Sequence, residues 1–370
     1  MRILLIHNEA QYFGGAEKML DYFLSALPDP AAFMVACVPG SKVEAIVPPA
    51  IEKIALKDNG RASILKIISQ ARTLRRASRD FPFDVVHGWA ARDWETASVF
   101  GWIARRPVLG TLHDHPRSTY ITSSRQRLMR LCARYGLTKV VCVSGAVRGA
   151  CLLAGYQPGK LAVIRNGLPR TCSEKKYKPL ENQLRLGYLG GFQENKGFAG
   201  VFEILRRLYK KGVSSWTLVI AGGASGAKAE AVLSKIRSQY CDDPWWSSIE
   251  WVGWVEHPMD FMASLDLLIF PSTAFDSFPN VLLEAGKAGI PVLAACVGGV
   301  PEIVDEGQTG CLFGCGNWEQ AAEILVELIR HPERLRQMGE AAADRSAYQF
   351  SVEKMIANYG ELYLKLQAYV

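Results

Sequence analysis

Short, continuous apolar runs alternate with longer amphipathic segments in this chain, and that alternation constrains the fold more than any other feature. The alternation occurs twice. In the first half the apolar runs are residues 2–7, 32–38, 84–87, 108–113, 139–144 and 161–165. It starts again later in the chain, with runs at residues 184–189, 216–221, 249–252, 267–270 and 291–295. Continuous apolar strands separated by helices predict parallel sheets that are covered by helices on both faces.

A polar stretch without apolar periodicity separates the two halves, which is typical of a linker. The length of 370 residues is enough for two ordinary domains. We therefore expect Rossmann-like domains over residues 1–168 and 184–350, joined by a linker over 169–183. The remaining residues, 351–370, are expected to form a final helix.

The charge is distributed unevenly. Residues 1–170 hold 24 Lys and Arg against 12 Asp and Glu, a balance of +12, whereas residues 171–370 hold 19 against 24, a balance of −5. Two predicted helices carry arginines at helical spacing, which are Arg72, Arg75, Arg76 and Arg79 on the first and Arg125, Arg127, Arg130 and Arg134 on the second. These helices could contact an anionic membrane surface or an anionic glycan, or they could simply be solvated.

The sequence favours a cytoplasmic protein, peripheral on the inner face of the membrane. The first apolar run ends at His7, which is too short for a secretion signal, and no run reaches the roughly 18 residues of a membrane span. Nine scattered cysteines show no disulfide framework or zinc spacing, so no metal site is expected. No nucleic-acid-binding motif accompanies the basic charge, so no nucleic-acid partner is expected.

The strongest functional signal is FPSTAFDSFPNVLLEAGKAGIPV, over residues 270–292. It is predicted to be a buried strand, a polar loop and a helix. Residues Ser277, Phe278 and Asn280 would present backbone N–H groups at the start of that helix, which suits a diphosphate. Asp276 in the loop and Glu284 on the helix could address different parts of one ligand. A capped helix with a solvent-facing carboxylate is the purely structural alternative.

A second motif, GYLGGFQENKG, spans residues 187–197 and is predicted to be a strand, a glycine-rich turn and a helix. Gly190 and Gly191 would let the backbone approach a phosphate, and Lys196 would supply a positive charge. The alternative is a glycine turn with a surface lysine.

Two shorter motifs follow predicted strands of the first half. Gly14 and Gly15 come just after the first strand, without the G-x-G-x-x-G pattern of a dinucleotide site. His113 ends the run at 108–113, within the segment GTLHDH. At the carboxyl end of a strand, His113 is favoured as a functional residue.

Together these segments resemble the family-4 retaining glycosyltransferases. Asp276 and Glu284 match that family's two acidic residues, E-x7-E, with Asp in place of the first Glu. The resemblance implies that Asp276 lies by the donor sugar and that Glu284 holds the ribose hydroxyls of the nucleotide.

The other motifs resemble the family in the same order along the chain. Lys196 matches the lysine of G-R-x4-K-G, which neutralises the donor pyrophosphate, whereas Gly191 stands at the arginine position. His113 matches the histidine of T-x-H-D, which contacts the donor sugar. Gly14 and Gly15 match the glycine loop that lies near the donor phosphates and the acceptor.

The resemblance implies an α/β protein of the GT-B fold, with two Rossmann-like, doubly wound domains that face a central cleft. The N-terminal domain would bind the acceptor, the C-terminal domain would bind the nucleotide sugar, and the final helix would cross back to the N-terminal domain. The implied donor-binding residues are Gly14, Gly15, Gly190, Gly191, Lys196, Ser277, Phe278, Asn280 and Glu284. The implied catalytic residues are His113, Asp276 and Lys196.

The implied reaction is the retaining, metal-independent transfer of a hexose-type sugar from a nucleotide-diphosphate sugar, with UDP favoured over GDP and no further cofactor. The acceptor would be a glycan or a lipid-linked molecule, in the synthesis of cell-surface polysaccharide or glycolipid. Two alternatives stay open. The missing arginine at Gly191 and the shortened Asp276 fit a non-catalytic nucleotide-sugar-binding subunit, and the same fold also serves nucleotide-sugar epimerases.

Overall fold

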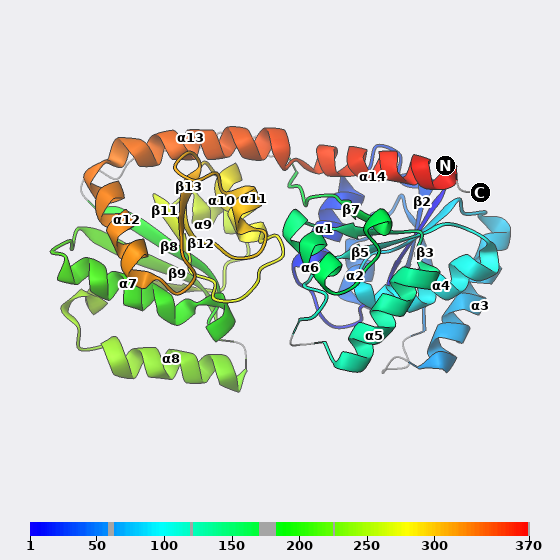
Figure 1. Cartoon of the computed structure of the whole chain (residues 1–370), viewed down its shortest axis with the longest axis horizontal. Coiled ribbons are helices and arrows are strands. Elements are labelled where there is room, and N and C mark those ends of the chain that lie inside the picture. Colours follow the sequence, from blue (N-terminus) through cyan, green and yellow to red (C-terminus); the bar gives the residue numbers. More distant parts are fainter. Residues whose placement is uncertain (58–62, 119–120, 170–182, 225, 369–370) are drawn as a thin grey trace. The chain divides into compact units, whose positions relative to one another are not determined.

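The computed structural model describes residues 1–57, 63–118, 121–169, 183–224 and 226–368 (Figure 1). The chain divides into two compact units. The first unit comprises Met1–Pro169 and Ser351–Val370, and the second comprises Arg170–Phe350. Most of the predicted linker, residues 170–182, lies outside the described residues. Each unit holds one parallel sheet with helices on its faces, so the predicted α/β fold class is confirmed.

The first sheet has seven parallel strands in the order β3-β2-β1-β4-β5-β6-β7. Its strands are β1 (Ile3–His7), β2 (Phe33–Cys37), β3 (Glu52–Ala55), β4 (Val85–Gly88), β5 (Val108–Leu112), β6 (Lys139–Cys142) and β7 (Leu161–Val163). The strand order reverses between β1 and β4, and ligands of open α/β sheets bind beyond the carboxyl ends of strands at such a point.

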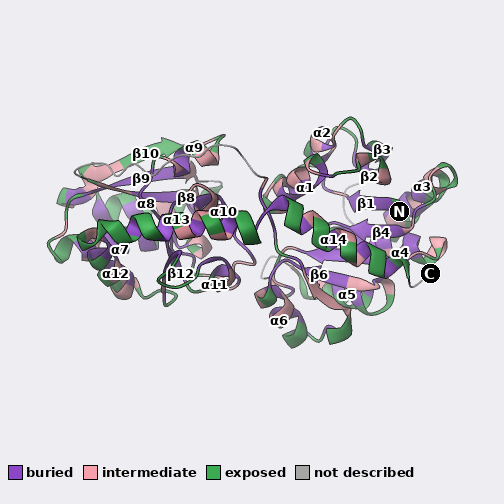
Figure 2. Ribbon diagram, turned by 90° about the horizontal axis from the view of Figure 1, so that it is seen from above, coloured by how far each residue is buried: buried purple, intermediate pink, exposed green. Residues whose placement is uncertain are grey.

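The helices of the first unit cover this sheet and present their exposed residues outward (Figure 2). They are α1 (Gly15–Ser25), α2 (Lys42–Ile46), α3 (Ile64–Asp80), α4 (Trp94–Ala104), α5 (Ser123–Leu131), α6 (Gly145–Leu153) and α14 (Val352–Gln367). A π-helical turn, Cys132–Gly136, continues α5. Among the predicted arginine faces, Arg125 differs from expectation because its side chain turns inward to the carbonyl of Ala91 and the carboxylate of Glu95.

Helix α14 belongs to the first unit although it comes last in the chain. Its buried Tyr363 hydroxyl lies 2.7 Å from Nδ1 of His87, and its Tyr359 hydroxyl lies 3.1 Å from the Thr111 hydroxyl. Thr111 in turn lies 2.8 Å from Nε2 of His87. Burial lowers the pKa of His87 to about 3, so this imidazole is neutral and offers one donor and one acceptor. Polar pairing deep in the unit therefore fixes the final helix.

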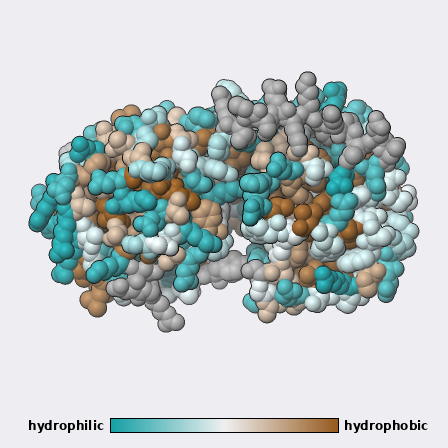
Figure 3. All heavy atoms as spheres, turned by 180° about the vertical axis from the view of Figure 1, so that it is seen from behind, coloured by the Kyte–Doolittle hydropathy of each residue, from teal (hydrophilic) through white to brown (hydrophobic). Residues whose placement is uncertain are grey.

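The second sheet has six parallel strands in the order β10-β9-β8-β11-β12-β13. The strands are β8 (Leu184–Gly191), β9 (Trp216–Gly223), β10 (Ile249–Gly253), β11 (Leu267–Phe270), β12 (Val292–Ala295) and β13 (Gly310–Phe313). The helices are α7 (Phe198–Lys210), α8 (Ala227–Tyr240), α9 (Pro258–Met262), α10 (Asn280–Lys287), α11 (Val300–Ile303), α12 (Trp318–Arg330) and α13 (Pro332–Gln349). Figure 3 shows one face of the molecule, where hydrophobic residues lie in separate patches among hydrophilic ones.

We expect Tyr363→Phe to lower the free energy of unfolding of the first unit by about 1–2 kcal/mol, because a buried partner of His87 is lost while the ring is kept. Urea unfolding followed by circular dichroism measures this change. Tyr135→Phe, at an exposed position, is the matched control and should change stability by less than about 0.5 kcal/mol. Equal effects of both substitutions would contradict the assigned role of Tyr363.

Candidate functional site

In the first unit, Gly14 and Gly15 lie after β1, where α1 begins, and His113 lies directly after β5, with β4 between these two strands. These strands are neighbours in the sheet, so their loops share one edge. Trp89, which follows β4, connects the loops. Its indole N–H donates to the carbonyl of Ala16 at 2.9 Å, and its own carbonyl lies 2.9 Å from Nε2 of His113. Sequence reasoning missed Trp89, whose only signal was its position directly after a buried strand.

His113 is held as a neutral imidazole. Burial lowers its pKa to about 4, and Nε2 faces a carbonyl oxygen that can only accept a hydrogen bond. The proton of the neutral ring therefore sits on Nε2, and Nδ1 is the acceptor nitrogen. A neutral histidine with an acceptor nitrogen can bind a hydroxyl group, but it cannot supply a full positive charge to a phosphate at pH 7.

A buried ion-pair network supports the glycine loop. His7, at the end of β1, places Nδ1 at 2.9 Å from the Asp93 carboxylate and Nε2 at 2.9 Å from Oε1 of Glu17. The other oxygen of Glu17 accepts from the backbone N–H of Gly14 at 2.8 Å. The chain Asp93–His7–Glu17–Gly14 therefore positions the loop that opens α1. Glu17 could have been found from its place three residues after the helix-capping Gly14.

The two carboxylates make His7 an imidazolium. Burial alone would lower the pKa of His7, but Asp93 and then Glu17 outweigh burial and raise that pKa to about 9. Because both carboxylates only accept hydrogen bonds, both ring nitrogens must donate. Asp93 also accepts from the backbone N–H groups of Asn8 and Ala90, at 2.8 and 2.9 Å. The network is thus closed on both sides of the ring.

We expect the stability contributed by His7 to be fully present below pH 6.5, its unfolded-state pKa, and to be lost as the pH rises through about 9. The destabilisation caused by His7→Gln should therefore be larger at pH 6 than at pH 9.5, by about 3 kcal/mol. Urea unfolding of both proteins at the two pH values measures the difference. His331→Gln, on a half-exposed side chain, is the control. A His7→Gln effect independent of pH would contradict the imidazolium.

In the second unit, Lys196 and Asp276 meet although they lie 80 positions apart in the sequence. Nζ of Lys196 lies 2.8 Å from Oδ2 of Asp276. The loops that carry them follow β8 and β11, which are adjacent in the sheet. Hydroxyl groups connect the two loops further, since Ser272 donates to the carbonyl of Asn195 and Thr273 to that of Glu194, at 3.0 and 2.7 Å.

Glycines allow this close approach of the loops. A Cβ at Gly197 would lie 1.7 Å from the carbonyl oxygen of Pro271, and the φ angle of Gly197 is +68°. Gly298, with a φ angle of +52°, packs equally tightly on Asp276, where a Cβ would lie 2.0 Å from its carbonyl oxygen. The backbone N–H of Gly299 donates to that same oxygen at 2.8 Å. Asp276 is therefore held by its backbone as well as by its ion pair.

Helix α10 begins at Asn280, immediately after this loop, in agreement with the strand, loop and helix that the sequence predicts over residues 270–292. Ser277 is half-buried, whereas Glu284 on the helix is buried. The ring of Phe278 is also buried and packs edge-on against Phe350, with 5.7 Å between the ring centroids. A ligand at this loop would therefore meet the backbone of Phe278 rather than its ring.

The predicted glycine-rich turn at Gly190 and Gly191 is wrong. Both residues extend β8 and pair with Gly222 and Gly223 of β9. The reason is close packing between the strands, because a Cβ at Gly222 would lie 2.0 Å from the carbonyl oxygen of Gly190. Gly191 has more space. The nearest neighbour of a Cβ at this position would be the Gln193 side chain, at 3.6 Å. The chain turns only later, at residues 194–197.

In the described parts of the chain, no helix is long and apolar enough to cross a bilayer. The same residues hold no group of three or more His, Cys, Asp or Glu side chains placed to bind one metal ion.

Two family models match consecutive parts of the chain, "Glycosyltransferase Family 4" over residues 13–171 and "Glycosyl transferases group 1" over residues 170–345. A D-inositol 3-phosphate glycosyltransferase of Corynebacterium aurimucosum is 34% identical over 306 residues, covering 73% of this chain and 68% of that protein. The capsular polysaccharide biosynthesis glycosyltransferase CapM of Staphylococcus aureus is 23% identical over 237 residues, covering 60% of each chain.

A crystal structure of Anabaena HepE in complex with UDP-glucose superposes with a TM-score of 0.81 at 20% identity, covering 99% of this chain and 100% of that one. This likeness shows the GT-B fold. The chain belongs to the group 1 glycosyltransferases of family 4, as its motifs predict. It spans about half or less of the length of the first curated relatives that it matches.

Proposed function

We propose that this chain is a retaining, metal-independent glycosyltransferase that uses a UDP-sugar. The observation that carries the proposal is the Lys196–Asp276 ion pair beside the start of α10, with Glu284 buried on the same helix. A cation and a carboxylate on two connected loops, followed by a helix N-terminus and a second carboxylate on that helix, match the parts of a nucleotide-diphosphate sugar. The UDP-glucose bound in HepE, a protein of the same fold, supports UDP as the nucleotide.

The residues take the following roles in this proposal. Lys196 and the start of α10 neutralise the pyrophosphate, while Asp276 orients the lysine and faces the sugar. Glu284 accepts hydrogen bonds from the ribose hydroxyls. The backbone of Ser277, Phe278 and Asn280 contributes N–H groups. The second unit thus binds the donor, whereas the first unit, with Gly14, Gly15 and His113, serves the acceptor and the donor sugar.

The chemistry follows from these groups. The bond between the sugar C1 and the phosphate oxygen breaks, and a bond from C1 to the acceptor oxygen forms on the same face. The departing phosphate takes the proton of the acceptor hydroxyl, so UDP leaves and the anomeric configuration is kept. Lys196 and the helix N-terminus stabilise the negative charge that grows on the leaving group. The neutral His113 accepts a hydrogen bond from a sugar hydroxyl through Nδ1.

The acceptor is a hydroxyl of a glycan or of a lipid-linked molecule in cell-surface polysaccharide or glycolipid synthesis. The role of CapM in capsular polysaccharide biosynthesis supports this class of acceptor. We place the reaction in the cytoplasm, at the inner face of the membrane, where the exposed arginines of the first unit fit an anionic surface.

We expect Glu284→Gln to weaken UDP-glucose binding by about tenfold to one hundredfold, because a charge-assisted hydrogen bond is worth about 1.5–3 kcal/mol. Isothermal titration calorimetry measures the affinity. Glu340→Gln on α13 is the control and should leave binding unchanged. UDP release with candidate glycan acceptors, with and without EDTA, then tests transfer and metal independence. The absence of binding by any nucleotide-diphosphate sugar would refute the proposal.

One observation favours a second candidate, a nucleotide-sugar-binding subunit without transfer activity. The arginine expected from the family pattern is absent, because Gly191 stands at its position. The motif therefore supplies Lys196 as its cation, and Lys196 is already paired with Asp276. Tight UDP-glucose binding without UDP release, across a panel of glycan acceptors, would establish this alternative.

Gly191→Arg tests what the missing arginine costs. The substitution fits the local space, because a Cβ there would make only ordinary contacts with Gln193. We expect UDP-glucose affinity to rise by at least about tenfold, since a guanidinium would add charge-assisted bonds to the pyrophosphate. Gly223→Arg, on the neighbouring strand, is the control because a Cβ there would meet no other atom within 4 Å. Equal effects of both substitutions would show a general charge effect instead of a specific contact.

A further inference from the structure

A cavity of about 600 Å³ opens on the surface of the first unit, and Gly14, Gly15 and His113 do not line it. It lies among α3, α4, the start of β5 and the end of the π-helical turn. The residues that matter for its chemistry are Arg75, Trp102, Arg105, Arg106, Tyr135 and Gly136.

The cavity lies at the opposite edge of the sheet from the candidate site. Arg105 and Arg106 come just before β5, and Gly136 comes shortly before β6. Because all strands of this sheet are parallel, the segments that precede them lie at the amino edge. His113 follows β5 and therefore lies at the carboxyl edge. A ligand in the cavity would leave the loops of the candidate site free.

The cavity is strongly basic. Within the described residues, the guanidinium groups of Arg75, Arg105 and Arg106 form no ion pair with a carboxylate. The surrounding sequence offers few acids, because residues 96–169 hold eleven Lys and Arg but only one acidic residue, Asp114. Arginines without a carboxylate partner that line one cavity favour an anion, and the planar guanidinium is suited to phosphate.

Arg105 occupies a backbone conformation that normally favours glycine. Its φ angle is +51°, and it is the single non-glycine residue with a positive φ angle among the described residues. It ends α4, a position where glycine is common. A left-handed arginine costs roughly 1–2 kcal/mol of strain. Such an outlier at a charged cavity supports a functional reason for the arginine.

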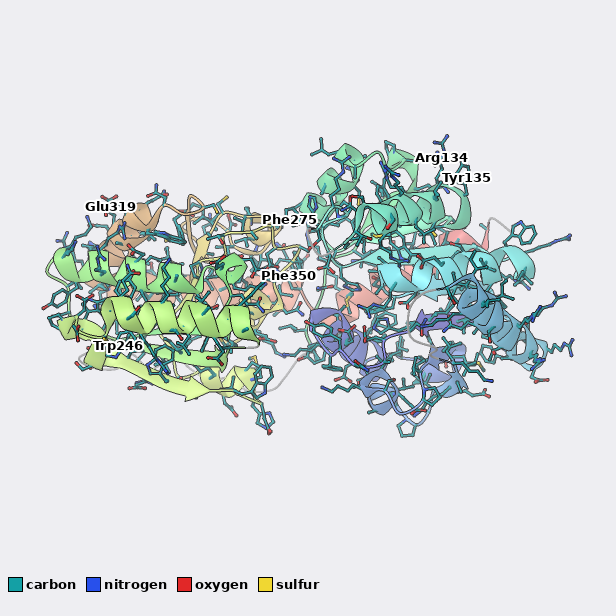
Figure 4. All side chains as sticks on the ribbon, turned by 90° about the horizontal axis from the view of Figure 1, so that it is seen from below. Arg134, Tyr135, Trp246, Phe275, Glu319 and Phe350 are labelled. Carbon is teal, nitrogen blue, oxygen red and sulfur yellow. The ribbon has the colours of Figure 1, made fainter. Side chains whose placement is uncertain are left out.

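Large, exposed side chains with apolar surface lie at the cavity: Trp102 and Tyr135 line it, and Leu131 is close to Tyr135 in the chain. Trp102 is 83% exposed, Tyr135 is 74% exposed and Leu131, one turn before Tyr135, is 53% exposed. Arg134 lies over the ring of Tyr135, 5.3 Å from its centroid, and Figure 4 shows the two side by side at the end of the π-helical turn. A soluble anion would leave these rings in water. Tryptophan and tyrosine beside basic residues are typical of a membrane interface.

We propose that this amino-edge cavity docks the protein on an anionic membrane by binding the phosphate of a lipid headgroup. Arg75, Arg105 and Arg106 contact the phosphate, and Trp102, Leu131 and Tyr135 enter the interfacial layer. Docking does not depend on the proposed transferase activity, because the residues involved are different. It leaves the carboxyl edge of the sheet open to a water-soluble donor.

Flotation of the full chain with lipid vesicles tests the proposal. Vesicles of phosphatidylcholine with and without phosphatidylglycerol are compared in low and high salt. The first variant is Arg105→Gly, which relieves the backbone strain while it removes the charge, so it should not unfold. A triple variant adds Arg75→Gln and Arg106→Gln. Arg336→Gln, an exposed arginine on α13, is the control for the loss of one charge.

We expect binding to the anionic vesicles alone, weakened by high salt and about fivefold by Arg105→Gly, since one basic residue near an anionic surface contributes about 1 kcal/mol. The triple variant should bind about one hundredfold more weakly. Trp102→Ala should weaken binding as well, whereas Arg336→Gln should not. Thermal melting verifies that each variant is folded.

Several results would overturn the proposal. They are equal binding to neutral vesicles, unchanged binding of the folded triple variant, or an equal loss with Arg336→Gln. Binding of a soluble anionic glycan without binding to vesicles would instead identify a glycan as the occupant. Retention of vesicle binding by Glu284→Gln, together with loss of UDP-glucose binding, would show that docking and the donor site are separate.

Discussion

Every strand pair in both sheets is parallel, and the rest of the structure depends on this constraint. Parallel strands end at one common edge, so loops far apart in the sequence become neighbours there. In the first unit this edge gathers the glycine loop and His113 around Trp89. In the second unit it brings Lys196 to Asp276. The polar groups of each candidate site are therefore positioned by the topology of a sheet rather than by proximity in the chain.

The two units hold their polar residues by different electrostatic means. His7 is a buried cation between two buried carboxylates. Removal of any partner would leave an uncompensated charge in the protein interior, which solvates charges poorly. The network positions Gly14 through the Glu17 carboxylate. Lys196, by contrast, is 42% exposed and its partner Asp276 is 13% exposed. Water screens this pair, so its ammonium group can shift toward a phosphate at little cost. A supporting network is thus buried, whereas the groups proposed to bind a ligand remain accessible.

The opposite edges of the first sheet have different chemistry. The carboxyl edge carries a neutral histidine and a backbone loop, whereas the amino edge carries unpaired arginines and exposed aromatic rings. Part of the excess positive charge in the first half of the sequence therefore lies at the amino edge of the sheet. Arg125 shows why the charge pattern alone was insufficient, since its side chain serves an internal contact with Glu95 while its neighbours face solvent.

The sequence by itself determined the fold class, most of the strands and the family, because apolar periodicity and local motifs depend on residues close together in the chain. It missed β3, an edge strand with three exposed residues out of four, and β13, a short strand that begins at a glycine. Only the tertiary structure decided that Gly190 and Gly191 extend a strand, that Lys196 pairs with Asp276, and that His7 joins Asp93 and Glu17. Only the tertiary structure brings Arg75 together with Arg105 and Arg106 at one cavity. These features need contacts across tens of residues, which the packing of helices and strands creates and local sequence patterns do not record.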